Sequence, residues 1–469
     1  MMITLYRAES YYECNEEDIK IVNYGEKWLV YNSISYGWCI VDEDELKKIF
    51  QPSDNSLEWN KKMYEAGILK CNRQYISVKD TKKDDIITYF EVNITNVCNL
   101  KCKYCVSNFN YCNRNISMDK KTAQNVVKKI YRYTKENKID SVCIELSGGE
   151  PLLNFDIVKE IVDFFKKVNL KVIFVIQTNG TLLDKEKIDY IRRNKNIQVA
   201  ISIDGITEEQ NSNRIDKKNK TILKKIMTNI KTLNEQGIKY SIVMVVNQKN
   251  VNNIEEIIDF FCGKKLTDAF SLLPLLPFGM ALQNEITIDV KDYIDAIISL
   301  NENYLMKVYQ NEDKKIVERN FSMISNYITS NNRNFICNQS PCGAARKIVS
   351  IGPAGDVYPC YGFQDNEEFL LGNLNSEFEL EQIKKSEILK KLYRRKVDEM
   401  KVCKECEYNI WCNGGCTSNA YLKDKNFMQK DDIYCSIYRA IIEKILFEYV
   451  ENEDKQKLIR NIGCKWEGK

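Results

Sequence analysis

The chain has 469 residues, which is enough for two to four domains, and its 44% hydrophobic and 29% charged residues are typical of a globular protein. Lys plus Arg (69) nearly balance Asp plus Glu (66), so there is no basic field for nucleic acid and no polybasic membrane anchor. Eighteen cysteines and no histidine exclude a Ser-His-Asp triad, Cys/His zinc fingers and histidine-ligated iron, and leave sulfur as the main metal ligand.

The first residues, "MMITLYRAES", contain no apolar stretch of signal-peptide length, and no later stretch approaches a membrane span. We therefore expect a cytoplasmic protein without membrane or nucleic-acid partners. In a reducing compartment its cysteines are free thiols or metal ligands rather than disulfides.

The N-terminal zone, residues 1–82, mixes short strands with helices. "EKWLVYNS" and "YGWCIV" predict strands, "EDELKKIF" and "LEWNKKMYEAGIL" predict helices, and "SVKDTKKDD" predicts a linker. This zone is expected to form a separate small domain.

Residues 86–310 alternate strand and helix. Six apolar strands are predicted, in "ITYFEVNIT", "SVCIELSGG", "KVIFVIQTNG", "IQVAISIDG", "YSIVMVVN" and "DAFSLLPLL". Amphipathic helices separate them, and the first, "SMDKKTAQNVVKKIYRYTKEN", opens with a predicted Ser cap. The pattern predicts an α/β fold, a partial (β/α)6 TIM-like barrel whose chemistry gathers at the carboxyl ends of the strands.

Three further zones complete the chain. Residues 311–336 are expected to form a helical bridge, residues 337–436 form a cysteine-dense domain, and residues 437–469 a closing helix.

The first cysteine group, "CNLKCKYC", directly follows the first barrel strand. It places Cys98, Cys102 and Cys105 on a loop at the carboxyl end of that strand. Structural zinc usually takes four ligands, whereas a cubane iron–sulfur cluster on three cysteines leaves one iron open to a substrate or cofactor. Cys112 lies close enough to be a fourth ligand, so a closed site is also compatible with the spacing.

"CNLKCKYC" resembles the CxxxCxxC signature of the radical S-adenosylmethionine (SAM) superfamily, including the aromatic residue before the last cysteine. The resemblance implies a [4Fe–4S] cluster whose open iron is chelated by SAM, and reductive cleavage of SAM to a 5′-deoxyadenosyl radical. The motifs "LSGGEP", "IQTNG" and "ISIDG" end the second, third and fourth strands and resemble family segments around SAM. The implied SAM contacts are Tyr104, Gly148, Gly149, Glu150, Gln177, Asn179, Ser202, Asp204 and Arg214.

The second cysteine group runs from Cys337 to Cys435 and resembles the SPASM extension of radical SAM enzymes, which holds two auxiliary four-iron clusters. The resemblance implies one cluster on Cys337, Cys342, Cys360 and Cys416, and a second on Cys403, Cys406, Cys412 and Cys435. Cys337 is the least secure ligand, and without it the first auxiliary cluster would keep an open iron. Two zinc ribbons are the alternative for this ladder. Cys143 and Cys262 are predicted to be plain buried thiols.

SPASM enzymes mostly modify peptides or proteins. In sulfatase maturases an Asp follows the cysteine of the "YPC" motif, but here that residue is Tyr361, which disfavours formylglycine formation. The N-terminal zone resembles the winged-helix-like PqqD peptide-recognition domain, with a structural cap on the barrel as the alternative. The resemblance implies capture of a leader peptide as an added edge strand.

These features predict a maturase of sactipeptide or ranthipeptide type that forms a Cys thioether in a ribosomally made peptide (RiPP), with a flavodoxin- or ferredoxin-type electron donor. The thioether rests on how often family members form one. A carbon–carbon crosslinking maturase, a sulfatase maturase and a zinc-stapled peptide-binding protein are the alternatives. The sequence leaves open the precursor, the crosslinked residues, the general base and the oligomeric state.

Overall fold

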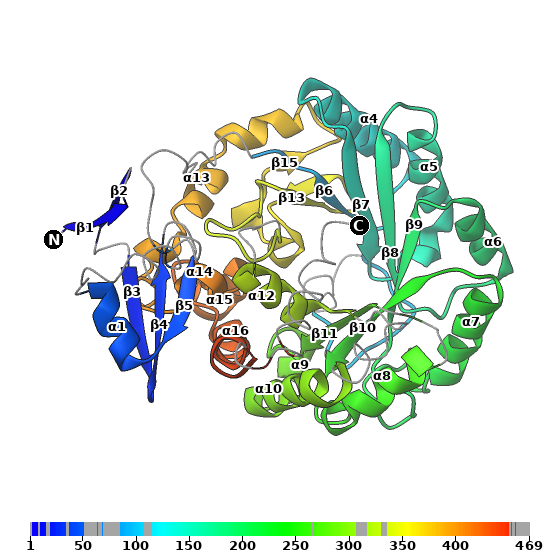
Figure 1. Cartoon of the computed structure of the whole chain (residues 1–469). Coiled ribbons are helices and arrows are strands. Elements are labelled where there is room, and N and C mark those ends of the chain that lie inside the picture. Colours follow the sequence, from blue (N-terminus) through cyan, green and yellow to red (C-terminus); the bar gives the residue numbers. More distant parts are fainter. Residues whose placement is uncertain are drawn as a thin grey trace.

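The structure is a computed structural model that describes residues 2–7, 10–15, 19–33, 37–50, 63, 68, 85–106, 115–263, 267, 269–305, 317–329, 335–449, 452 and 455. It contains a large, mostly parallel sheet that curves around an interior, with helices on its outside (Figure 1).

Six parallel strands form the body of this sheet, and they confirm the predicted strand segments. They are β6 (Tyr89–Thr95), β7 (Ser141–Gly148), β8 (Lys171–Thr178), β9 (Ile197–Ser202), β10 (Tyr240–Val246) and β11 (Ala269–Pro274). Neighbours along the chain are neighbours in the sheet. The fold is therefore α/β with a parallel sheet, as predicted.

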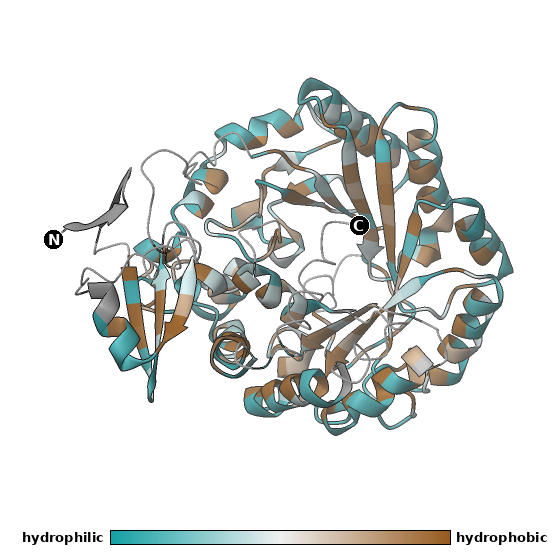
Figure 2. Ribbon diagram, viewed as in Figure 1, coloured by the Kyte–Doolittle hydropathy of each residue, from teal (hydrophilic) through white to brown (hydrophobic). Residues whose placement is uncertain are grey.

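Amphipathic helices cover the outer face of these strands. They are α4 (Lys120–Glu136), α5 (Phe155–Phe165), α6 (Lys185–Arg193), α7 (Leu223–Glu235) and α8 (Ile254–Gly263). Figure 2 shows apolar strands and helices whose polar faces point outward. The cap of α4 differs from the prediction: Asp119, not Ser117, accepts a hydrogen bond from the backbone N–H of Thr122 (2.7 Å). Ser117 instead bonds the hydroxyl of Thr95 (2.7 Å), which ties the helix entrance to β6.

The two faces of the sheet differ in exposure. Along β7, β8, β10 and β11 fully buried side chains alternate with partly exposed ones. Because side chains of a strand alternate between faces, the buried set faces the helices and the partly exposed set lines the interior. We call the latter the inner face.

The sheet continues beyond both ends of the six strands. The edge of β11 carries β12 (Val317–Glu318), while β13 (Ile348–Ile351) pairs in parallel with β6 and is followed by β14 (Asp356–Tyr358) and β15 (Gly372–Asn373). The ten strands are ordered β12-β11-β10-β9-β8-β7-β6-β13-β14-β15. The cysteine-dense region is therefore joined to the barrel through one continuous sheet.

Shorter helices occupy the second half of the chain. The regular ones are α9 (Met280–Gln283), α10 (Val290–Ser299), α12 (Arg319–Thr329), α13 (Glu387–Tyr393), α14 (Asn409–Cys412), α15 (Thr417–Asp424) and α16 (Asp432–Lys444). The π-helical turns η5 (Leu300–Leu305) and η10 (Ile445–Tyr449) continue α10 and α16. The short 3₁₀-helices are η3 (Pro151–Asn154), η4 (Val251–Asn253), η6 (Tyr361–Phe363), η7 (Glu367–Phe369), η8 (Leu380–Lys385) and η9 (Val397–Glu399).

Two predicted boundaries differ from these elements. The bridge over 311–336 is not wholly helical, because β12 adds to the sheet before α12 begins. The boundary at 436/437 falls inside α16, which begins earlier because Asp431 caps it by accepting from the N–H groups of Ile433 and Tyr434.

The N-terminal zone forms β1 (Met2–Arg7) paired with β2 (Ser10–Asn15), and a three-stranded antiparallel sheet of β3 (Ile19–Tyr24), β4 (Lys27–Asn32) and β5 (Trp38–Val41), followed by α1 (Glu43–Phe50). The indole N–H of Trp38 donates to the carbonyl of Ile328 in α12 (2.9 Å), and Tyr24 stacks on Phe447 at 4.0 Å between ring centroids. The helix predicted over 57–69 lies mostly outside the described residues.

Within the described parts of the chain, no helix combines the length and the apolar character needed to cross a membrane.

Candidate functional site

The loop with the first three cysteines leaves the carboxyl end of β6 and is fixed by a neighbouring segment. The N–H of Lys101 donates to the carbonyl of Ile215 (2.8 Å), and that of Lys103 to the carbonyl of Asn213 (2.9 Å). The segment after β9 therefore holds the cysteine loop in place through backbone hydrogen bonds.

The thiols of this loop lie close enough to perturb one another. Burial raises the pKa of Cys98 to about 11 and that of Cys102 to about 12, and the charge of Cys105 acts on both. Without metal these two thiols stay protonated at neutral pH, and a bound cluster would displace the protons. Cys112, the possible fourth ligand, lies outside the described residues.

Gly148 and Gly149 are needed where β7 meets the cysteine loop. A side-chain carbon on Gly148 would lie 2.2 Å from the carbonyl oxygen of Thr95, and one on Gly149 would lie 2.4 Å from that of Val97. The N–H of Gly149 donates to Thr95 (2.7 Å) and that of Glu150 to Val97 (3.0 Å). Both glycines therefore pack closely against the backbone that leads into Cys98. The sequence predicted that they approach a ligand, and it did not predict this packing role.

Glu150 is fully buried, and both of its carboxylate oxygens have protein donors. Oε1 accepts from the hydroxyl of Thr178 (2.7 Å) and the N–H of Leu152 (3.1 Å), while Oε2 accepts from the N–H of Asn179 (2.8 Å). Burial raises the pKa of Glu150 to about 7, although these bonds oppose the shift. This carboxylate fastens β7 to β8 beside the cysteine loop.

Three predicted contacts, Tyr104, Asp204 and Arg214, bind one another. The hydroxyl of Tyr104 donates to Asp204, which is fully buried and lies 3.1 Å from Nε of Arg214. The Arg214 guanidinium lies over the Tyr104 ring at 5.6 Å. These residues form a polar support beneath the cysteine loop.

The remaining predicted polar contacts differ in availability. Asn179 donates to Asn99 (2.9 Å) and to the sulfur of Cys98 (3.8 Å), so it already supports the loop. Gln177 and Ser202 lie partly exposed on the inner face, and no hydrogen bond joins either side chain to the described residues. These two are the most available for a ligand.

The cysteines of the second half gather in two groups. Burial raises the pKa of Cys337 to about 12, and Cys342 and Cys416 contribute to it; Cys360 has its pKa raised by burial and by charges that include the other three. In the second group the pKa of Cys412 is raised mainly by burial. The charges of Cys435, Cys403 and Cys406 raise it further, so these three thiols lie near Cys412. The groups have the same members as the two ligand sets implied by the SPASM resemblance.

The donor sets are compatible with iron–sulfur clusters. Four thiolates around one zinc ion lie about 4 Å apart, because each Zn–S bond is about 2.3 Å, whereas the corners of a cubane hold its ligands further apart. Among the described residues no three Cys, Asp or Glu side chains converge tightly enough to bind a single ion. Thiols gathered in groups of four without that tight arrangement are compatible with [4Fe–4S] clusters.

Of the two thiols expected to be plain and buried, Cys262 is buried at 4% exposure, whereas Cys143 is partly exposed on the inner face. Cys143 lies on β7 opposite Tyr89 of β6.

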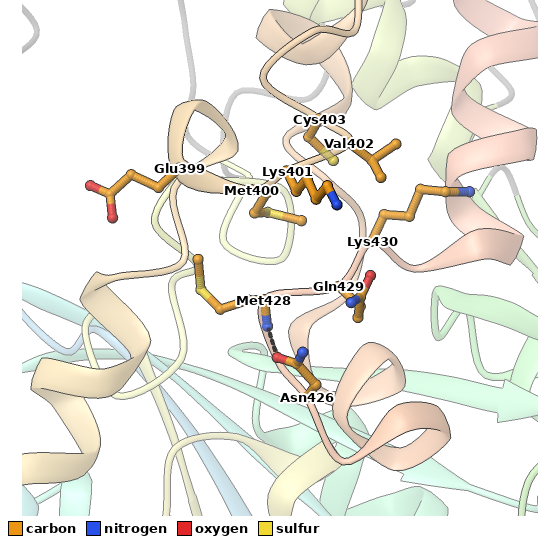
Figure 3. A pocket seen from close by; sticks show the side chains of 9 residues that line it. All are labelled: Glu399, Met400, Lys401, Val402, Cys403, Asn426, Met428, Gln429 and Lys430. Atoms are coloured by element: carbon orange, nitrogen blue, oxygen red, sulfur yellow. Dashed lines mark hydrogen bonds between the residues drawn. The ribbon is translucent and has the colours of Figure 1, made fainter.

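A surface pocket of about 230 Å³ lies beside Cys403 (Figure 3). Figure 3 shows Met400 and Met428 on one side of it and the side chain of Lys430 at another. Cys403 itself is only 7% exposed. One thiol of the second group thus lies just beneath the protein surface.

Sequence reasoning missed several residues that order the site. Asn99 donates to Thr181 (2.8 Å) and accepts from Asn179, and Asn250 donates to the carbonyl of Asp204 (2.8 Å). Asn99 lies inside the "CNLKCKYC" motif and Asn250 outside any motif. Neither was predicted, because both act through contacts between loops at the strand ends, and these contacts are not visible in the sequence. Glu91 and Glu145 were also missed, because charged residues inside apolar strands carry no spacing signal.

Family models match two parts of the chain. Residues 92–261 match the model described as the radical SAM superfamily, and residues 342–407 match SPASM, described as an iron–sulfur cluster-binding domain. These matches favour an iron–sulfur enzyme over a zinc-stapled binding protein.

Two curated relatives are similar over most of their length. A cysteine-type anaerobic sulfatase-maturating enzyme of Clostridium novyi (strain NT) is 29% identical over 74% of this chain and 92% of its own. The radical SAM cyclopropyl synthase TigE of Paramaledivibacter caminithermalis is 24% identical over 94% of this chain and 93% of its own.

Solved structures share the fold. The anaerobic sulfatase-maturating enzyme anSMEcpe, solved with bound AdoMet and the Cp18Cys peptide, has a TM-score of 0.66 at 19% identity, over 80% of this chain and 99% of its own. Streptococcus suis SuiB, solved with its precursor peptide SuiA, has a TM-score of 0.56 at 20% identity, over 90% of this chain and 99% of its own.

Proposed function

Because the chain is a radical SAM enzyme with a SPASM domain, whose cofactors are SAM and [4Fe–4S] clusters, we propose that it installs a Cys thioether in a ribosomally synthesised precursor peptide. The observation that carries the proposal is the pair of four-cysteine groups. Helices α14 and α15 of the cysteine-dense region lie between the barrel and the N-terminal sheet (Figure 1). A radical centre, two further clusters and a candidate peptide-binding sheet are what such a reaction requires.

The residues of the chain divide the task. Cys98, Cys102 and Cys105 would hold the SAM-binding cluster, and the two four-cysteine groups would hold two auxiliary clusters, three clusters in all. The first cluster, with SAM bound and an electron supplied, would provide the radical chemistry that removes a hydrogen atom from the substrate. Gln177 and Ser202, available on the inner face, would contact SAM. Tyr104, Asp204 and Arg214 would hold the cysteine loop in place.

The N-terminal sheet would bind the leader of the precursor. It has two edge strands, β3 and β5, and an extended peptide adds to such an edge through backbone hydrogen bonds. The similarity to SuiB extends over 90% of the chain, and that protein was solved with a precursor peptide. A flavodoxin- or ferredoxin-type protein in the cytoplasm would supply the electron.

Carbon–carbon bond formation is the second candidate, favoured by the alignment with TigE over 94% of the chain. Formylglycine formation is favoured by the 29% identity to a sulfatase maturase but opposed by Tyr361, which stands where those enzymes carry an Asp.

Mass spectrometry separates these reactions. The anaerobically reconstituted enzyme is mixed with SAM, a reductant and any short Cys-rich peptide found to be encoded beside its gene. The product should lack two hydrogen atoms per crosslink, with a cysteine that no longer reacts with iodoacetamide. The variant Cys98→Ala is the control and should give no product.

Loss of two hydrogens with every cysteine still alkylated would replace the thioether by a carbon–carbon bond. An aldehyde on a sulfatase-derived peptide, with the precursor unchanged, would establish the sulfatase reaction instead.

A further inference from the structure

Two glutamates face each other on neighbouring strands of the inner face. Glu91 on β6 and Glu145 on β7 are register partners in the parallel ladder, so their side chains point to the same side of the sheet. Both are partly exposed, unlike Phe90, Val92, Ile144 and Leu146 beside them, which are fully buried against the helices. The pair therefore lines the space that the sheet encloses.

In each carboxylate one oxygen accepts a hydrogen bond from the protein, and the other oxygen is available to a ligand. Oε2 of Glu145 accepts from the hydroxyl of Tyr89 (2.5 Å), and Oε2 of Glu91 accepts from the backbone N–H of Tyr361 (2.6 Å). Among the described residues, no donor bonds Oε1 of either. Two fixed carboxylates thus present one unused oxygen each.

No cation of the described chain pairs with these glutamates. Two arginines with well-buried side chains form ion pairs elsewhere. Arg214 lies 3.1 Å from Asp204, and Arg346 lies 2.7 Å from Asp85. Arg319 is the basic residue whose charge reaches Glu91 and Glu145, yet within the described structure it forms no ion pair with them. Its guanidinium lies over the ring of Phe335 at 4.9 Å, and the thiol of Cys337 is foremost among the groups that favour its charge. Two adjacent carboxylates in a partly enclosed space repel each other, and their charges are costly without a closer cation.

An unsatisfied donor lies at the same turn. Gln364 is 3% exposed and follows η6, the turn whose first N–H holds Glu91. Its Oε1 accepts from the hydroxyl of Ser350 (2.9 Å) and from Asn93, which lies two residues after Glu91 on β6. Its Nε2 is buried and has no partner in the described structure. A buried amide donor without a partner points to a bound group that carries an acceptor, such as a peptide carbonyl or water.

We infer that Glu91 and Glu145 form a specificity site that binds a positively charged side chain, Lys or Arg, of the substrate peptide. The inference rests on the proposed function, since it assumes a peptide between the cysteine loop at the end of β6 and Cys360 next to Tyr361. An ammonium or guanidinium would donate to the two available oxygens, and the peptide carbonyl beside it would accept from Gln364.

The test uses ligand-observed NMR on the anaerobically reconstituted full-length enzyme. The probes are Nα-acetyl-L-lysine N-methylamide and its norleucine analogue, which lacks only the amine. The lysine probe should bind about tenfold or more tightly than the norleucine probe, as expected for a charge-assisted pair of contacts. The variant Glu91→Gln/Glu145→Gln keeps the acceptors for Tyr361 and Tyr89, and should remove this preference.

Glu235→Gln is the matched control, because that side chain is 59% exposed on α7 and should leave the preference unchanged. Iron content and melting temperature show that each variant is folded, and the single variant Glu145→Gln should lose part of the preference. Equal binding of both probes to the wild-type enzyme, or an unchanged preference in the double variant, would overturn the inference. The probes need no turnover, so failure to modify a precursor would count against the proposed function alone.

Discussion

Gly149 shows how a single residue joins two strands at the site. A side-chain carbon there would overlap the carbonyl of Val97 at 2.4 Å, and this carbonyl belongs to the residue before Cys98. We expect Gly149→Ala to lower stability by about 2 kcal/mol or more, because backbone cannot move aside as a side chain can, and to reduce iron binding at the first site. Calorimetric melting and iron analysis measure both effects.

Gly237→Ala is the control for that substitution. Gly237 has φ +64° but no atom within 4 Å of an added carbon, so only the left-handed backbone opposes alanine, at about 1 kcal/mol. Iron content should not change. Equal effects of the two substitutions would contradict the packing role of Gly149.

Asp204 is a second residue that supports the cysteine loop through contacts within the protein. It is fully buried, accepts from Tyr104 and pairs with Arg214, so Asp204→Asn would leave a buried guanidinium uncompensated. We expect a loss of about 3 kcal/mol or more, which is several degrees in melting temperature. Asp295→Asn removes an exposed partner of Lys291 and should change stability by no more than about 0.5 kcal/mol. Similar small shifts for both variants would show that the buried pair does not support the loop.

At the scale of elements, the sequence predicted those with a strong local period. The six barrel strands and helices α4 to α8 are apolar or amphipathic over enough residues to be identified. The short strands β12 to β15, of two to four residues, have no such signal and exist because a longer strand pairs with them. At the site, Asn99 lies within the first cysteine motif and Asn250 outside any motif, and neither was predicted, because their roles depend on contacts between loops.

Helix α16 links the end of the chain to the first auxiliary group through its cap. Asp431 is 4% exposed and accepts from the N–H groups of Ile433, Tyr434 and Cys416. We expect Asp431→Ala to cost about 1–2 kcal/mol for the cap and also to loosen Cys416, so that iron is lost. Melting temperature and iron per chain report the two effects separately.

Asp289 offers a matched cap without a thiol. It accepts from the N–H of Lys291 (2.8 Å) at the start of α10. Asp289→Ala should lower the melting temperature but keep the iron content of the wild-type enzyme. Unchanged iron in Asp431→Ala as well would show that the cap does not position Cys416.

At the scale of the whole molecule, the three sulfur groups should act as separate sites. Replacing Cys98, Cys102 and Cys105 by Ala should abolish SAM cleavage and lower iron per chain by about one third, since each cubane holds four irons. Replacing Cys143 and Cys262, which belong to none of the groups, should leave iron unchanged. Loss of nearly all iron in the triple variant would mean that the auxiliary sites depend on the first.

The order of synthesis adds a consequence of the continuous sheet. β6 pairs on one side with β7, about 50 residues later in the chain, but on the other side with β13, which lies more than 250 residues after β6. On the ribosome, one edge of the first barrel strand stays open until residue 351 has left the exit tunnel, and an open edge invites pairing with other chains. Nascent chains would therefore need protection by a chaperone, and a fragment that ends before residue 348 should aggregate even though it contains all six barrel strands.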